Sequence, residues 1–86
     1  MKTLAYFKKN PLRITVSIIN GCIAIKASCG HHKATFYYFK ELNEELLYQK
    51  VTKTMYLDNI TELSSQSIQH LCAGAIATCE SIASEY

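Results

Sequence analysis

The sequence lacks a long hydrophobic run. No stretch approaches the roughly 20 consecutive apolar residues that a membrane-spanning helix needs. The N-terminal segment MKTLAYFKKNP has a basic start but only four apolar residues between Thr3 and Lys8, whereas a secretory signal needs about 7–15. We therefore expect a soluble, cytoplasmic protein whose four cysteines are reduced thiols.

Repeats, linkers and low-complexity tracts are also lacking. Hydrophobic residues make up 49% of the chain and charged residues 19%, which is typical of a globular protein and excludes a disordered one. The 86 residues suffice for one small domain, which we place at 1–86. A domain of this size is often marginally stable alone, so self-association is a reasonable expectation.

Recognisable catalytic patterns are missing as well. The three glycines, Gly21, Gly30 and Gly74, are too far apart for a phosphate-binding loop. Nucleophilic catalysis needs a base beside the nucleophile and a pocket that holds both. His31 and His32 fall at a predicted turn, and His70 has no obvious partner. We therefore expect no enzymatic activity and no cofactor.

A metal site is the alternative use of the histidines and cysteines. Cys22 and Cys29 lie seven residues apart, which is roughly 20 Å along an extended strand. Zinc–ligand bonds of about 2.0–2.3 Å cannot bridge that separation. Cys29, His31 and His32 could converge at a turn, but they would need a fourth ligand from elsewhere. The sequence therefore predicts no metal site.

Acidic residues are absent from the first 40 positions, which contain seven basic ones. Residues 41–86 contain seven acidic and two basic residues, so the two parts carry formal charges of +7 and −5. This segregation points to an electrostatically selected partner or to association of opposite ends of two copies. Chance segregation in a short chain is the alternative.

Two turn signals predict an antiparallel meander. Asn20-Gly21 separates two apolar runs and is typical of a two-residue type I′ hairpin turn. Gly30-His31 suits a type II′ turn. Strands at 12–19, 22–29 and 32–40 then place an apolar set that includes Val16, Ile25 and Phe36 on one face. The other face is mainly polar but also carries Tyr37 and Phe39, and a one-residue slip would destroy this sorting.

The remaining segments are less uniform. Alternation and β-branched residues in KVTKTMYL predict a fourth strand at 50–57. Residues 41–49 remain open between helix and loop, and residues 1–11 could add a strand. Apolar positions spaced by three and four predict a helix at 65–85, started by Asn59 with Glu62 or by Ser64 or Ser65. Cys72 and Cys79 fall on its buried stripe, where a thiol acts as a small hydrophobe.

The predicted fold is α+β, with a three- to four-stranded antiparallel meander and one amphipathic C-terminal helix on its apolar face. The opposite face would carry five candidate partner-binding residues: Arg13, Lys26, Lys33, Tyr37 and Phe39. Cations beside exposed aromatics suit single-stranded nucleic acid and equally an acidic protein surface. An ordinary polar face, or one covered by the N-terminal segment through Tyr6 and Phe7, is the third interpretation.

A second candidate surface is the far side of the predicted helix. Its residues are small and almost uncharged: Ala73, Gly74, Ala77, Thr78 and Ser81. Glycine inside a helix costs about 1 kcal/mol relative to alanine, and small residues let another backbone approach closely. This side is a candidate dimer seam or partner-helix site, or simply an exposed alanine- and serine-rich face.

The functional hypothesis is a non-catalytic small binding protein that occupies a macromolecular surface, such as a protein complex or an acidic protein. By analogy of size and architecture alone, such a protein could be a phage or mobile-element inhibitor of host defence, in the style of anti-CRISPR proteins. A nucleic-acid-binding module is the alternative. A small enzyme or metal protein is the third class.

Overall fold

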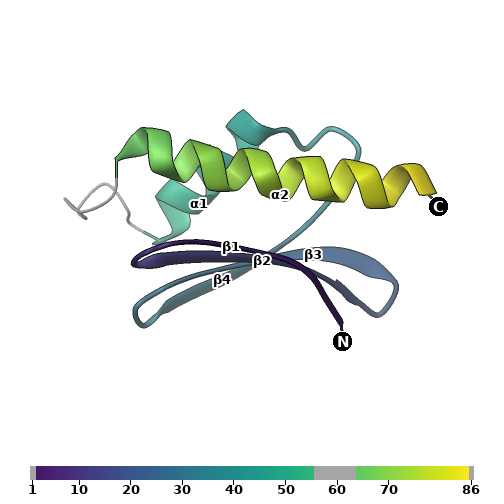
Figure 1. Cartoon of the computed structure of the whole chain (residues 1–86), viewed down its shortest axis with the longest axis horizontal. Helices are drawn as coiled ribbons and strands as arrows, with labels where there is room; N and C mark the ends of the chain where they lie inside the picture. The colour runs from purple at the N-terminus through teal and green to yellow at the C-terminus, as the bar shows by residue number, and fades with distance from the viewer. Residues whose placement is uncertain (1, 56–63, 86) are drawn as a thin grey trace.

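The computed structural model describes residues 2–55 and 64–85. Four strands come first: β1 (Lys2–Lys9), β2 (Leu12–Ile19), β3 (Cys22–Cys29) and β4 (His32–Tyr37). Two helices follow, α1 (Glu44–Met55) and α2 (Ser65–Glu85). The strands form one antiparallel sheet in the order β1-β2-β3-β4, and both helices lie on the same side of it (Figure 1).

The two hairpin turns have the predicted register. Val16 lies opposite Ile25 across the first turn, and Ile25 lies opposite Phe36 across the second. Asn20 and Gly21 have φ angles of 53° and 82°, the left-handed conformations that a type I′ turn requires. The predicted meander is thus confirmed, although β4 ends at Tyr37 rather than at residue 40.

The N-terminal residues 2–9 form strand β1 and belong to the sheet. This strand pairs with β2, placing Phe7 opposite Ile14 and Lys8 opposite Arg13, with an irregularity in register between Thr3 and Ala5. Because β1 extends the sheet at its edge, it does not cover the face opposite the helices. The interpretation that the N-terminal segment covers this face through Tyr6 and Phe7 is therefore wrong. The side chain of Phe7 instead packs against the core.

The strand predicted at 50–57 is wrong, because residues 44–55 form α1; residues 56 and 57 lie outside the described part of the chain. The helix begins where the Leu46 amide donates a hydrogen bond to Asn43 Oδ1 (2.8 Å), an N-cap contact. Leu47 and Val51, one helical turn apart, are both fully buried. Tertiary burial of this pair outweighs the strand preference of the β-branched residues.

Helix α2 matches the predicted range 65–85. The Ser67 amide donates to Ser64 Oγ (3.1 Å), which identifies Ser64 as the N-cap; Asn59 and Glu62 lie outside the described residues. The buried side chains are Ile68, Leu71, Cys72, Ala75, Ile76 and Cys79. Helix α2 covers β1 and β2, and α1 packs on β3, β4 and α2. Among the described residues, no helix is long and apolar enough to cross a membrane.

Candidate functional site

The face of the sheet turned away from both helices is left uncovered by any other described element (Figure 1). We call it the outer face. Because side chains alternate along each strand, the pairing register arranges its residues in rows that cross the sheet. The first row is Lys8, Arg13, Ser28 and Lys33; the second is Tyr6, Thr15, Lys26 and Thr35; the third includes Ser17, Ala24 and Tyr37.

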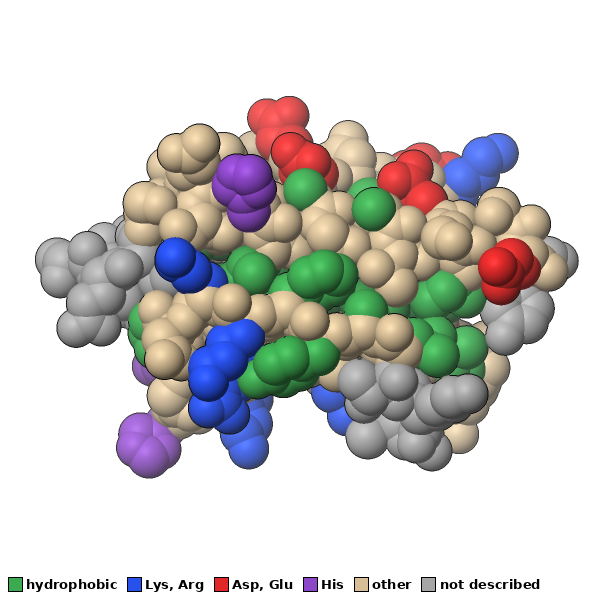
Figure 2. All heavy atoms as spheres, in the orientation of Figure 1, with side chains coloured by type: hydrophobic (Ala, Val, Ile, Leu, Met, Phe, Trp, Pro, Cys, Tyr) green, Lys and Arg blue, Asp and Glu red, His purple; other side chains and the backbone are tan. Residues whose placement is uncertain are grey.

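The first row is strongly basic. Lys8 and Arg13 lie directly opposite each other, an arrangement that destabilises an antiparallel pair. The four strands contain six basic residues and no acidic residue. Figure 2 shows most of the visible basic side chains along the sheet and the acidic side chains over the helices. The charge segregation of the sequence therefore becomes a segregation between the two sides of the molecule.

Two hollows lie side by side on the outer face. One, with a volume of about 360 Å³, is lined by Thr15, Lys26, Ala27, Ser28, Lys33, Ala34 and Thr35. The other, of about 270 Å³, is lined by Asn10, Pro11, Arg13, Ser28 and Gly30. Both share Ser28, and neither lining includes a carboxylate. Hydroxyl and cationic groups can all donate hydrogen bonds, so the two hollows are suited to anionic groups.

Aromatic side chains flank these hollows. Tyr6 lies on β1 in the row of Lys26, and Tyr37 lies on β4 two residues beyond Thr35. Each tyrosine exposes 54% of its surface. In the third row, Ser17 and Ala24 are buried and Tyr37 is exposed. Of these three residues, Tyr37 is therefore the one that can contact a partner.

Four of the five predicted partner-binding residues meet on this face: Arg13, Lys26, Lys33 and Tyr37. The fifth, Phe39, is 43% exposed but lies beyond the end of β4. Lys8 and Tyr6 were not predicted as partner-binding residues of this face, because the conformation of the first eleven residues was left open. The dipeptide Asn10-Pro11, a turn signal, could have revealed the β1–β2 pairing.

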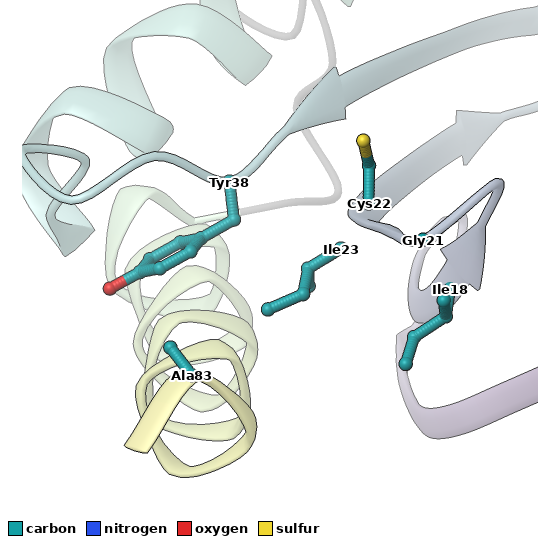
Figure 3. Close-up of a pocket in the computed structure, with 6 residues that line it drawn as sticks. All are labelled: Ile18, Gly21, Cys22, Ile23, Tyr38 and Ala83. Atoms are coloured by element: carbon teal, nitrogen blue, oxygen red, sulfur yellow. The ribbon is translucent and has the colours of Figure 1, made fainter. Parts of the chain in front are cut away.

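A larger hollow opens at the far end of the sheet, with a volume of about 410 Å³ (Figure 3). Its lining is mainly apolar: Ile18, Gly21, Cys22, Ile23, Tyr38 and Ala83. Ile23 and Tyr38 extend towards the part of α2 that carries Ala83, whereas the Cys22 thiol points away from them (Figure 3). Among the described residues, the lining of this hollow includes no histidine or carboxylate beside the exposed thiol.

The other cysteines lie in the interior. Cys29, Cys72 and Cys79 are buried, which confirms the predicted packing role of the two helix thiols. Burial, aided by the negative charge of Glu44, raises the pKa of Cys72 to about 12. Burial and Glu80 likewise raise the pKa of Cys79 to about 11. Both thiols are therefore protonated and unreactive at neutral pH.

The predicted turn histidines, His31 and His32, are exposed on the outside of the β3–β4 turn. Within residues 2–55 and 64–85, no group of three or more histidine, cysteine, aspartate or glutamate side chains comes close enough together to hold a metal ion.

The small-residue side of α2 is partly used inside the fold. A Cβ atom built on Gly74 would lie 2.6 Å from Cε1 of Phe7, so the missing side chain lets the helix approach β1. The Thr78 hydroxyl donates to the Gly74 carbonyl (2.9 Å), and Ala73 is half-buried. Ala77 and Ser81 remain exposed. Gly74 therefore contacts Phe7 within the same chain, which removes from the candidate dimer seam the residue that would allow the closest approach of a second helix.

Comparison of this chain with family models, with curated proteins and with solved structures finds no match.

Proposed function

We propose that this chain is a non-catalytic binding protein that acts by placing the outer face of its sheet on an anionic macromolecular surface. One observation carries the proposal: the row of Lys8, Arg13 and Lys33 on strands that contain no acidic residue. A like-charge pair in a sheet costs stability. An anionic partner would relieve the repulsion between Lys8 and Arg13, and this relief would contribute to the free energy of binding.

The hollows support binding rather than catalysis. The described lining of the apolar hollow at the sheet end places no histidine or carboxylate beside the Cys22 thiol. The two hollows of the outer face present hydroxyls and cations without a carboxylate. Such donor sets neutralise charge and position a ligand, but they offer no pair of groups to transfer a proton.

The partner class in this proposal is an acidic protein surface, a protein complex or a nucleic acid inside the cell, where the exposed Cys22 thiol stays reduced. Occupying a surface is how small inhibitors of host defence act, and an anti-CRISPR-like role of a phage or mobile-element protein belongs to the proposal by analogy of size and architecture. A homodimer through the exposed part of α2, at Ala77 and Ser81, is a further element of it.

Salt-dependent retention on immobilised heparin tests the proposal. The variant R13Q/K33Q removes two charges from the outer face, and the matched control K50Q/K53Q removes two exposed charges from α1. Both variants have the same net charge. We expect the outer-face variant to elute at a clearly lower salt concentration than the control, which should stay close to the unchanged protein.

Circular dichroism of both variants checks that each one keeps the fold. Equal losses of retention would mean that only net charge matters, and absence of retention of the unchanged protein would mean that the face binds no polyanion. Either result overturns the proposal.

A further inference from the structure

We infer that the outer face binds single-stranded nucleic acid, with phosphates in the two adjacent hollows and bases stacked on Tyr6 and Tyr37. This inference rests on the proposed function and names the partner of the same face. It is carried by the juxtaposition of two hollows lined by basic and hydroxyl side chains with two half-exposed aromatic rings, one at each edge of the sheet.

The hollows fit consecutive anionic groups of one chain. Arg13 and Lys33 lie on either side of Ser28 in the same row, and neighbouring strands are about 4.8 Å apart, so the Cα atoms of Arg13 and Lys33 are about 10 Å apart. Arg13 lines one hollow, Lys33 lines the other, and Ser28 lines both. A phosphodiester backbone crossing the strands meets the two sites in succession.

The tyrosines distinguish nucleic acid from an acidic protein. Tyr6 is at the β1 edge and Tyr37 at the β4 edge, and both have 54% of their surface exposed. Stacking of a base on an aromatic ring strengthens binding and tolerates any base, because every base has a π face. Carboxylate side chains of an acidic protein would use the cations but would gain nothing comparable from the ring faces.

A single strand suits the face better than a duplex. Bases in a duplex are already stacked on one another, and only unpaired bases are free to cover a tyrosine ring. The four strands span about 14 Å, which accommodates a few nucleotides and not the repeated backbone contacts of a long duplex. The chemistry does not depend on the sugar, so DNA and RNA are both candidates.

Fluorescence anisotropy with labelled oligothymidylate and oligouridylate of about 15 nucleotides tests the inference. The same assay uses a duplex of equal length and, as competitor, a polyglutamate peptide. We expect the single strands to bind more tightly than the duplex. We also expect the polyglutamate competitor to displace little of the bound single strand. Comparison of the two oligonucleotides shows whether the sugar affects affinity.

Two variants separate stacking from charge. Y37A should weaken binding of the single strand roughly ten-fold, while Y37F should stay within about two-fold, because phenylalanine keeps the ring. R13Q/K33Q should reduce the magnitude of the negative slope of log K against log salt by about 1.4, since each phosphate contact on a single strand contributes about 0.7.

The inference is overturned if the duplex binds as tightly as the single strand, or if Y37A binds as well as Y37F. It is also overturned if heparin and polyglutamate bind the outer face but neither oligonucleotide does, and the proposed function then stands with an acidic protein as partner. If the unchanged protein is not retained on heparin, the proposed function itself fails.

Discussion

The two faces of the sheet are made by the same strands but differ in burial and in charge. On β2, Ile14 and Val16 point into the core and are fully buried, while Arg13 is exposed on the outer face. The inner face is packed against two helices with apolar side chains. The outer face instead places Lys8 opposite Arg13. The inner face is arranged for stability, whereas the outer face keeps an unfavourable charge arrangement that stability alone does not explain.

The largest difference between the faces should appear when neighbouring residues are truncated. I14A removes a fully buried side chain and should lower the free energy of unfolding by about 2–5 kcal/mol. R13A, one residue away on the exposed face, should change it by no more than about 0.5 kcal/mol. Urea denaturation measures both values. Similar losses for the two variants would show that the outer face contributes to stability as the inner face does.

A second effect tests how closely the inner face is packed. G74A should lower the free energy of unfolding by about 1–3 kcal/mol, because the new Cβ would lie 2.6 Å from the Phe7 ring. In an isolated helix the same change is favourable by about 1 kcal/mol.

The variant F7A supplies the control for this second effect. In that background, G74A should raise stability by about 1 kcal/mol, because the helix propensity of alanine then acts alone. Thermal or urea unfolding of the four proteins gives the coupling between the two residues. A coupling near zero would mean that the ring moves aside and that Gly74 is not needed for the approach of α2 to β1.

The smallest expected effect concerns the outer face. R13E replaces a repulsion with Lys8 by an attraction and should stabilise the protein by about 0.2–1 kcal/mol, while weakening retention on heparin. K33E is the matched control, because its neighbour in the row is Ser28, so it should weaken retention without a comparable gain in stability. A loss of stability in R13E would contradict the interpretation that Arg13 is kept for binding.

Much of the sheet could be predicted because turn chemistry and side-chain alternation are local. Asn20-Gly21 and Gly30-His31 set the register of β2, β3 and β4, and the sorting of apolar side chains agreed with both turns. Helix α2 was predictable for a similar reason, since its buried stripe repeats over many turns.

Helix α1 was not predictable in this way. Val51, Thr52 and Thr54 favour a strand locally. The alternation of Val51, Lys53, Met55 and Leu57 with Thr52, Thr54 and Tyr56 is also what a strand would show. The deciding contribution is the burial of Leu47 and Val51 against the rest of the core, which is a long-range interaction. Local preference therefore predicted a strand where the folded chain forms a helix.

The candidate site was predictable in part. Arg13, Lys26, Lys33 and Tyr37 followed from the register of the meander, because alternate residues of paired strands share a face. Lys8 and Tyr6 depended on the pairing of β1, and Phe39 was assigned to a strand that ends two residues earlier. The hollows around Ser28 needed coordinates, because their shape depends on side-chain positions from several strands.

The meander of β2, β3 and β4, its register, the C-terminal helix and the separation of charge along the chain were predictable, because all of these follow from local turn preferences, periodicity and composition. The helical conformation of residues 44–55 and the contact between Gly74 and the Phe7 ring became evident only in the folded protein. Each of these depends on contacts between segments distant in the chain, where burial of apolar surface outweighs local preference.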